Sequence, residues 1–306
     1  MRILKATLAA LTAILLAGLL AGLLTACSGE ELPAGSDGAE ATTAAPIPPH
    51  VMNPDAITLF FHGTTLETSV PDSGIVAEGS SFIITKGGSY ELQGNLVGGQ
   101  LQVAVSKEED VELIFNGFTA SCETTAPLYV ACAGKTEIYL VPGTVNELTD
   151  GVHYQFPSSE VDKPNACLYS ADDLVIRGEG ALTVRGHYNN GIGCRNDLRI
   201  LDCSLTVSAP NNILKGNDSV EISGAALRLT GGEDAIKADT TDRADKGYIL
   251  ITAGSEIEIS CADDAIQATL AITVERGAAV TGRCGGDMLN CPGIINADSK
   301  AMQLTN

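Results

Sequence analysis

Two consecutive stretches of the sequence decide the fold: residues 190–209, NGIGCRNDLRILDCSLTVSA, and residues 212–229, NILKGNDSVEISGAALRL. In each stretch, a first apolar residue is followed by two pairs of apolar residues, and the members of a pair are two positions apart. Side chains two positions apart lie on the same face of a β-strand. Each stretch therefore predicts three short strands, and the set repeats after 22 residues, the step from Ile192 to Leu214.

The same pattern recurs on both sides of these stretches, with Gly and polar residues at the expected corners. One repeat cannot bury its inward residues alone, so the repeats must stack about 4.8 Å apart and hydrogen-bond to one another. The sequence therefore predicts an all-β fold, a right-handed parallel β-helix (a solenoid) with three short strands per rung. The inward residues of the clearest rungs are Leu168, Leu174, Ile176, Leu182 and Val184; Ile192, Leu198, Ile200, Leu205 and Val207; Leu214, Val220, Ile222, Leu227 and Leu229; Ile236, Ile249, Ile251, Ile257 and Ile259; and Ile266, Ile272, Val274 and Val280.

We expect this β-helix domain to cover residues 56–306. Short apolar strands with less regular spacing in residues 82–148 indicate N-terminal rungs of the same helix, and residues 152–164 indicate a loop at one corner. The final rungs are incomplete and lack a polar cap. Since an open solenoid end exposes strand edges, we expect that the sequence is incomplete at its C-terminus or that a partner caps it.

The N-terminus has the features of an export signal. Arg2 and Lys5 precede a long apolar run, and the sequence LTAC ending at Cys27 resembles the lipobox of bacterial lipoproteins. An ordinary signal peptide or an uncleaved membrane helix is the alternative. We favour cleavage after residue 26 and lipidation of Cys27, because small residues precede the cysteine and a polar segment follows it. This predicts a protein anchored by lipid to the outer face of the cytoplasmic membrane, exposed at the cell surface.

Composition and charge narrow the possible partners. Residues 27–55 are rich in Gly, Ala, Thr and Pro, which predicts a flexible stalk between the anchor and the domain. The formal net charge of the whole chain is −20, and it becomes −22 without residues 1–26. Such a protein repels nucleic acids and anionic lipid headgroups, so the predicted membrane contact is the lipid on Cys27 alone. It attracts cations.

A ladder of polar residues precedes the first inward residue of successive rungs. Its amide members, Asn190 and Asn212, suit a structural role because amides stack without charge and satisfy the backbone at corners. Carboxylates one rung apart repel by about 3.5 kcal/mol at an effective dielectric constant of 20, and a bound cation removes that cost. We therefore predict calcium here, with an acidic insertion nearby supplying further ligands. The predicted metal ligands are Asp234, Asp239, Asp242, Asp245, Asp263, Asp264 and Asp287.

A second ladder, Asp172, Asn196 and Asp218, follows the first inward residue of each rung. Lys215 and Lys237 lie between the two ladders on neighbouring rungs, where they can relieve acidic charge or meet a uronate carboxylate. Lys237 and Arg195 are also weak candidates for a catalytic base.

No zinc-finger spacing, P-loop or serine-hydrolase elbow is present, and the eight cysteines after Cys27 could form disulfides or a buried thiol ladder.

Several of these rungs together resemble a known family. Residues 190–198, NGIGCRNDL, residues 233–239, EDAIKAD, residues 246–251, KGYILI, and residues 262–268, ADDAIQA, are similar to secreted carbohydrate-binding β-helix proteins of fibre-degrading anaerobic bacteria. The resemblance covers about residues 80–306. It implies a fold similar to that of pectate lyases, binding of cellulose or of acidic sugars such as polygalacturonate, and calcium on the helix. Ala235 and Ala265 depart from the family, which usually has Gly at these positions.

Three functions are compatible with these features. The first is a non-catalytic lipoprotein that binds plant-type polysaccharide, with calcium bridging acidic protein and acidic sugar, and with Tyr188 and Tyr248 as further ligand contacts. The second is a calcium-dependent polysaccharide lyase, in which the metal acidifies the proton beside a uronate carboxylate. The third is a surface adhesin or scaffold that binds no glycan. The sequence favours the first, because nothing in it places a base beside both metal and substrate.

Overall fold

The computed structural model describes residues 48–156 and 163–305, which all belong to one compact unit, Ala41–Asn306. The predicted signal peptide, Cys27 and residues 28–47 of the predicted stalk lie outside the described residues. Over the described ranges, no helix has the length and apolar character needed to cross a membrane.

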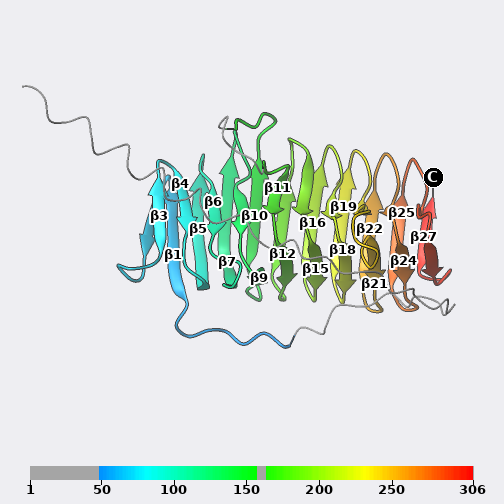
Figure 1. Ribbon diagram of the computed structural model, residues 1–306, viewed down its shortest axis with the longest axis horizontal. Coiled ribbons are helices and arrows are strands. Elements are labelled where there is room, and N and C mark those ends of the chain that lie inside the picture. Colours follow the sequence, from blue (N-terminus) through cyan, green and yellow to red (C-terminus); the bar gives the residue numbers. More distant parts are fainter. Residues whose placement is uncertain (1–47, 157–162, 306) are drawn as a thin grey trace, which may run out of the picture. The chain divides into compact units, whose positions relative to one another are not determined.

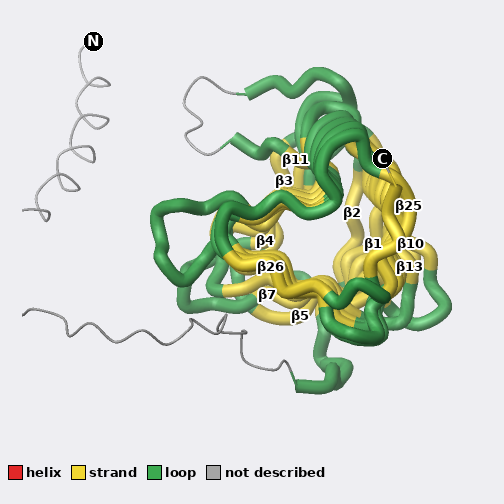
Figure 2. The backbone as a smooth tube through the Cα atoms, turned by 90° about the vertical axis from the view of Figure 1, so that its right-hand side faces the viewer, coloured by secondary structure: helices red, strands yellow, loops and turns green. Residues whose placement is uncertain are grey.

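The described chain coils into stacked rungs, and each full rung contributes one strand to each of three parallel columns (Figures 1 and 2). Viewed along the stack in Figure 2, the strands enclose a common axis. The predicted parallel β-helix with three short strands per rung is confirmed.

Column 1 is a sheet of its own, and the candidate site lies on it. Its first strand, β3, pairs antiparallel with β4, and the strands from β4 to β23 are parallel. The strands of column 1 are β3 (Ile75–Glu78), β4 (Ser81–Ile84), β6 (Leu101–Ala104), β8 (Leu128–Cys132), β11 (Ala166–Ser170), β14 (Asn190–Cys194), β17 (Leu214–Gly216), β20 (Ile236–Ala238) and β23 (Ile266–Ala268).

Columns 2 and 3 form one continuous sheet, because the long strands β5 and β7 pass from one column to the other. Column 2 consists of β5 (Gly88–Val97), β7 (Val111–Cys122), β9 (Lys135–Leu140), β12 (Asp173–Arg177), β15 (Asp197–Leu201), β18 (Ser219–Ser223), β21 (Tyr248–Ile251), β24 (Ala271–Val274) and β26 (Ile294–Ala297). Column 3 consists of β1 (Ile57–Gly63), β2 (Thr65–Thr68), β10 (Val145–Asp150), β13 (Ala181–Arg185), β16 (Ser204–Ala209), β19 (Ala226–Gly231), β22 (Glu256–Ser260), β25 (Ala279–Arg283) and β27 (Met302–Thr305).

The core is an aliphatic stack inside the three columns. In column 1, Ile192, Leu214, Ile236 and Ile266 follow one another in register, and each is fully buried. The inward pairs predicted for columns 2 and 3 belong to the same buried cluster. Because one identical face is buried in every rung, the register of the rungs is fixed, and each outward residue also lies above its counterpart.

Two segments depart from the regular coil. Residues 239–247 connect β20 to β21 as an insertion at one corner. Residues 48–55, the last part of the predicted stalk, contain no strand and lie against column 2, where Arg177 donates a hydrogen bond to the Pro48 carbonyl. We call residues 48–55 the strap.

Candidate metal and glycan site

The corner that leads into column 1 carries the predicted ladder in vertical register. The backbone N–H of Asn212 donates to Oδ1 of Asn190 at 3.2 Å. The backbone N–H of Asp264 donates in the same way to Oδ1 of Asp234 at 3.1 Å, and that of Asp287 donates to Oδ1 of Asp264 at 2.7 Å. These bonds tie the Asn190 rung to the Asn212 rung, as predicted for the amides, and the Asp234, Asp264 and Asp287 rungs to one another, whereas Oδ1 of the buried Asn212 accepts no hydrogen bond within the described residues.

Three carboxylates of this ladder region come together. Oxygen atoms of Asp234, Asp263 and Asp264 all lie within 4.8 Å of one another, and we call these residues the acidic trio. Asp234 and Asp264 are buried, whereas Asp263 is exposed. The pKa of Asp263 is raised, first by the charge of neighbouring Asp264 and then by desolvation. The trio therefore holds more negative charge than its own groups neutralise.

A glycine keeps space open beside the trio. A Cβ atom at Gly286 would lie 2.6 Å from Oδ1 of Asp263 and 2.6 Å from Oδ1 of Asp264. Any other residue would push these oxygens aside. Predicted ligand Asp287 lies on the next rung but is not part of the trio.

The side chains of the two predicted lysines, Lys215 and Lys237, point toward opposite ends of the strands of column 1. Lys215 and Lys237 are paired in the strand register and both point outward. Nζ of Lys237 lies 2.8 Å from Oδ2 of Asp234, so it neutralises one carboxylate of the trio. Nζ of Lys215 lies 2.7 Å from Oδ2 of Asp239, which directly follows β20 at the C-terminal end of the strands. With three carboxylates and one ammonium, the trio and Lys237 carry a formal charge of −2.

The insertion does not extend the predicted metal site, in contrast to the expectation from its acidic residues. Asp239 pairs with Lys215, while Asp242 and Asp245 are exposed and lie outside the trio. The insertion instead supplies cations near the C-terminal ends of the strands of column 1. Arg243 binds the buried Asp218 of the second ladder, and Nζ of Lys246 lies 2.7 Å from Oδ2 of Asp197. In the second ladder itself, Asp218 is bound by Arg243 and Asp172 is bound by Lys107, so both carboxylates have cationic partners.

A row of outward side chains runs along column 1 in register: Tyr129, Tyr169, Gly193, Lys215, Lys237 and Gln267. Gly193 leaves a gap in this row, since a Cβ there would lie 3.2 Å from Cδ2 of Tyr169. The gap is part of a hollow of about 90 Å³ whose lining includes Tyr169, Arg195 and Lys215. The predicted catalytic candidate Arg195 follows β14, so it lies two rungs away from Lys237 on β20.

The two predicted tyrosine contacts differ. Tyr188 is 37% exposed and stacks on Tyr154 with ring centroids 4.0 Å apart, at the turn before β14. Tyr248 is only 2% exposed, and its hydroxyl donates to Glu221 at 2.8 Å. The prediction that Tyr248 contacts a ligand is wrong, because its outward ring is covered by its own neighbours.

A larger, open groove lies on a different face. It has a volume of about 430 Å³ and crosses the outer side of column 3 from β13 to β25. Its lining includes Thr183, Thr206 and Thr281, and an ion pair between Arg228 and Glu258 at 2.7 Å. It has no aromatic lining and no cluster of like charge, so it lacks the chemistry that distinguishes column 1.

Sequence reasoning missed two groups of contacts. The cations Arg243 and Lys246 belong to the insertion that the sequence predicts to be acidic, and only their side-chain directions show that they neutralise Asp218 and Asp197. His50 belongs to the predicted stalk, yet it contacts Glu112 on column 2. None of the eight cysteines in the described residues forms a disulfide, and Cys261 and Cys284 are buried one rung apart.

Proteins similar to this chain in sequence and in fold are known. A protein from Acetivibrio thermocellus described as a carbohydrate-binding domain-containing protein is 36% identical over 213 residues, which cover 70% of this chain and 74% of that protein. A solved structure described as a gadolinium derivative of the polysaccharide lyase-like protein from C. thermocellum matches with a TM-score of 0.78 at 36% identity. The match covers 82% of this chain and all of that one.

The match to a family model covers the β-helix almost completely. The model of the carbohydrate-binding domain-containing proteins matches residues 78–301, which include both ladders, the acidic trio and the row on column 1. This chain therefore belongs to the family of carbohydrate-binding domain-containing proteins.

Proposed function

We propose that this protein is a non-catalytic, cell-surface lipoprotein that binds plant-type polysaccharide, with acidic sugars such as polygalacturonate favoured over cellulose, and that calcium at the acidic trio takes part in binding. The single observation that carries the proposal is the trio of Asp234, Asp263 and Asp264 beside the outward Lys237 on column 1.

The trio fits a hard divalent cation. Calcium prefers oxygen ligands at about 2.3–2.6 Å, and carboxylates from two successive rungs can reach one ion. A formal charge of −2 on the trio and Lys237 equals the charge of one such ion. The space that Gly286 leaves at the trio oxygens supports the same conclusion. The gadolinium in the solved relative belongs to that protein, and it makes a hard-cation test of this chain worthwhile.

An acidic sugar fits the rest of the row. At the net charge of this chain, a polyuronate is repelled unless cations lie between the two. Lys215 and Lys237 on neighbouring rungs, with Arg195 at the hollow, present cationic groups along the stacking direction. The hollow beside Tyr169 offers an aromatic edge, and exposed Tyr188 can add a stacking contact at the corner.

Anchoring is part of the proposal. Lipidation at Cys27, followed by a stalk, would hold the domain at the outer face of the cytoplasmic membrane and leave column 1 open to polysaccharide. Metabolic labelling with a fatty-acid analogue tests this: labelling of the wild type and its loss in Cys27→Ala support the anchor. Equal labelling of both proteins contradicts it.

A calcium-dependent lyase is the second candidate, because Lys237 lies beside the trio and the solved relative is described as polysaccharide lyase-like. A lyase base must accept a proton, whereas Lys237 donates to Asp234 as an ammonium. This ion pair favours binding without catalysis.

Incubation with a glycan panel separates the candidates. We expect retention on polygalacturonate that is lost with a chelator and in Asp234→Asn/Asp264→Asn, without unsaturated product absorbing in the ultraviolet. Glu256→Gln/Glu258→Gln in the column 3 groove is the matched control and should bind normally. Ultraviolet-absorbing product would establish the lyase, while no binding to any glycan would favour a scaffold. Binding that is lost only in the column 3 variant would move the site to that groove.

A further inference from the structure

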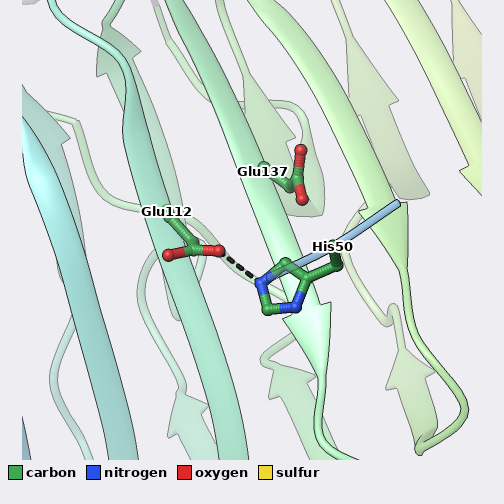
Figure 3. A group of neighbouring side chains, drawn as sticks. All are labelled: His50, Glu112 and Glu137. Carbon is green, nitrogen blue, oxygen red and sulfur yellow. Dashed lines mark hydrogen bonds and ion pairs between the residues drawn. The ribbon is translucent and has the colours of Figure 1, made fainter. Parts of the chain in front are cut away.

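A second group of possible metal ligands lies on column 2, away from the acidic trio. It consists of His50, Glu112 and Glu137, whose donor atoms lie within 4.8 Å of one another. His50 belongs to the strap, while Glu112 and Glu137 lie on β7 and β9 and are paired in the strand register. Figure 3 shows the imidazole on its separate segment, pointing to Glu112, with Glu137 on the neighbouring strand.

The group is held in place by contacts around it. The ring of His50 stacks on Tyr139 with centroids 3.5 Å apart and planes 9° apart. Nε of Arg177 lies 3.5 Å from Oε1 of Glu137, and the same side chain donates to the Pro48 carbonyl at 2.8 Å. The side chains of His50, Glu112 and Glu137 are only 7%, 19% and 14% exposed. Supporting contacts of this kind orient the ligands in protein metal sites.

The ligand chemistry differs from that of the acidic trio. An imidazole nitrogen suits zinc and other transition metals, whereas calcium prefers sites made of oxygen alone. Three protein donors, one nitrogen and two carboxylate oxygens, match the ligand types of zinc, and a fourth position can be filled by water. Nε2 of His50 now lies 2.5 Å from Oε1 of Glu112, a contact that an ion between the two groups would replace.

We propose that His50, Glu112 and Glu137 form a binding site for a transition-metal dication such as Zn²⁺, which fastens the strap to the side of the β-helix. The strap follows column 2 along the stacking direction: Asn53 donates to Ser89 on β5, His50 lies over β7 and β9, and Pro48 contacts Arg177 on β12. A metal at His50 therefore fixes the strap against β7 and β9.

The test uses equilibrium dialysis of the full mature chain against Zn²⁺. Since His50, Glu112 and Glu137 lie outside the core, His50→Ala and Glu112→Gln/Glu137→Gln keep the fold, which circular dichroism verifies. We expect the wild type to bind one more ion than either variant, with affinity at this site reduced by roughly 100-fold in both. His62→Ala, which removes a half-exposed histidine on β1, is the matched control and should bind as the wild type does.

Two further readouts separate this site from others. Co²⁺ in the site should give no thiolate charge-transfer band, since no cysteine is a ligand, and Asp234→Asn/Asp264→Asn should leave Zn²⁺ binding unchanged. Zn²⁺ should slow amide hydrogen exchange in residues 48–56 of the wild type but not of the glutamine variant. Equal Zn²⁺ binding by the wild type and His50→Ala, a thiolate band, or no binding by the wild type would overturn the proposal.

Discussion

At the corner before column 1, two pairs of successive rungs make the same hydrogen bond from a backbone N–H to a side-chain oxygen. In one pair the side chains are amides, and in the other they are carboxylates. Asn190 accepts the N–H of Asn212 at 3.2 Å, and Asp234 accepts the N–H of Asp264 at 3.1 Å. The fold therefore needs only an acceptor oxygen at this position. Because an amide can accept that hydrogen bond and neighbouring carboxylates repel one another, the negative charge points to a role outside folding, and binding a cation is the role that the geometry supports.

The largest expected effect comes from making the carboxylate corner into an amide corner. Asp234→Asn/Asp264→Asn keeps the Oδ1 acceptors of the two backbone N–H groups but removes two charges from the trio. We expect calcium affinity to fall about 100-fold, or roughly 2.7 kcal/mol, measured by calorimetric titration. Glu256→Gln/Glu258→Gln removes equal charge from column 3 and should leave affinity unchanged. Equal losses in both variants would mean that net charge, and not the trio, attracts the ion.

The next effect separates the hydrogen bond from the charge. Asp264→Ala leaves the N–H of Asp287 and the amide of Asn290 without their acceptors, so we expect a loss of about 1–3 kcal/mol in unfolding free energy without calcium. Asp264→Asn keeps the acceptor for the Asp287 N–H and gives up only the acceptor for Asn290, so it should lose less stability than Asp264→Ala. Denaturant unfolding in a chelator measures both. If the two variants lost the same stability, the charge itself would be structural.

A smaller effect concerns the ammonium that the carboxylate corner has and the amide corner lacks. Lys237→Met removes the positive charge 2.8 Å from Asp234. We expect calcium affinity to rise roughly fivefold, on the order of 1 kcal/mol, because an ion no longer shares the trio with Lys237. Binding to polygalacturonate should fall in the same variant. A fall in calcium affinity instead would show that Lys237 positions the ligands.

The smallest expected effect is a dependence of stability and of calcium affinity on pH. The pKa of Asp263 is raised because the Asp264 carboxylate lies beside it, so the folded protein holds this proton more tightly than the unfolded chain. Without metal, this contribution destabilises the fold at neutral pH and disappears as the pH falls through the raised pKa.

Calcium competes with the same proton, so its affinity should weaken as the solution is acidified. Titrations at neutral and mildly acidic pH measure the change, and Asp263→Asn should show a shallower dependence. An identical pH profile for the variant would exclude Asp263 as a ligand.

The parts of the fold and of the candidate site that could be predicted are those that repeat along the sequence. Ile192, Leu214, Ile236 and Ile266 repeat in sequence, so the columns, the core and the vertical register of Asp234, Asp264 and Asp287 were predictable, and the structure confirms them. A rung-to-rung repeat fixes which residues are stacked, because the buried face leaves one register.

The directions of long side chains were not predictable in this way. Lys237 turns back to Asp234, whereas Lys215, its partner in the register, reaches forward to Asp239. Tyr248 points outward, as alternation requires, but its hydroxyl bond to Glu221 places it in a buried position. Contacts of the non-repetitive segments, such as Arg243 on Asp218 and His50 on Glu112, have no periodic signal at all.

Anomalous diffraction from crystals grown with calcium, or with a lanthanide in its place, tests the central claim most directly. Our account predicts an ion bonded to oxygens of Asp234, Asp263 and Asp264, with none at the amide corner of Asn190 and Asn212. A fully occupied ion elsewhere on the β-helix, with no ion at the trio and the Lys237–Asp234 ion pair intact, would contradict it.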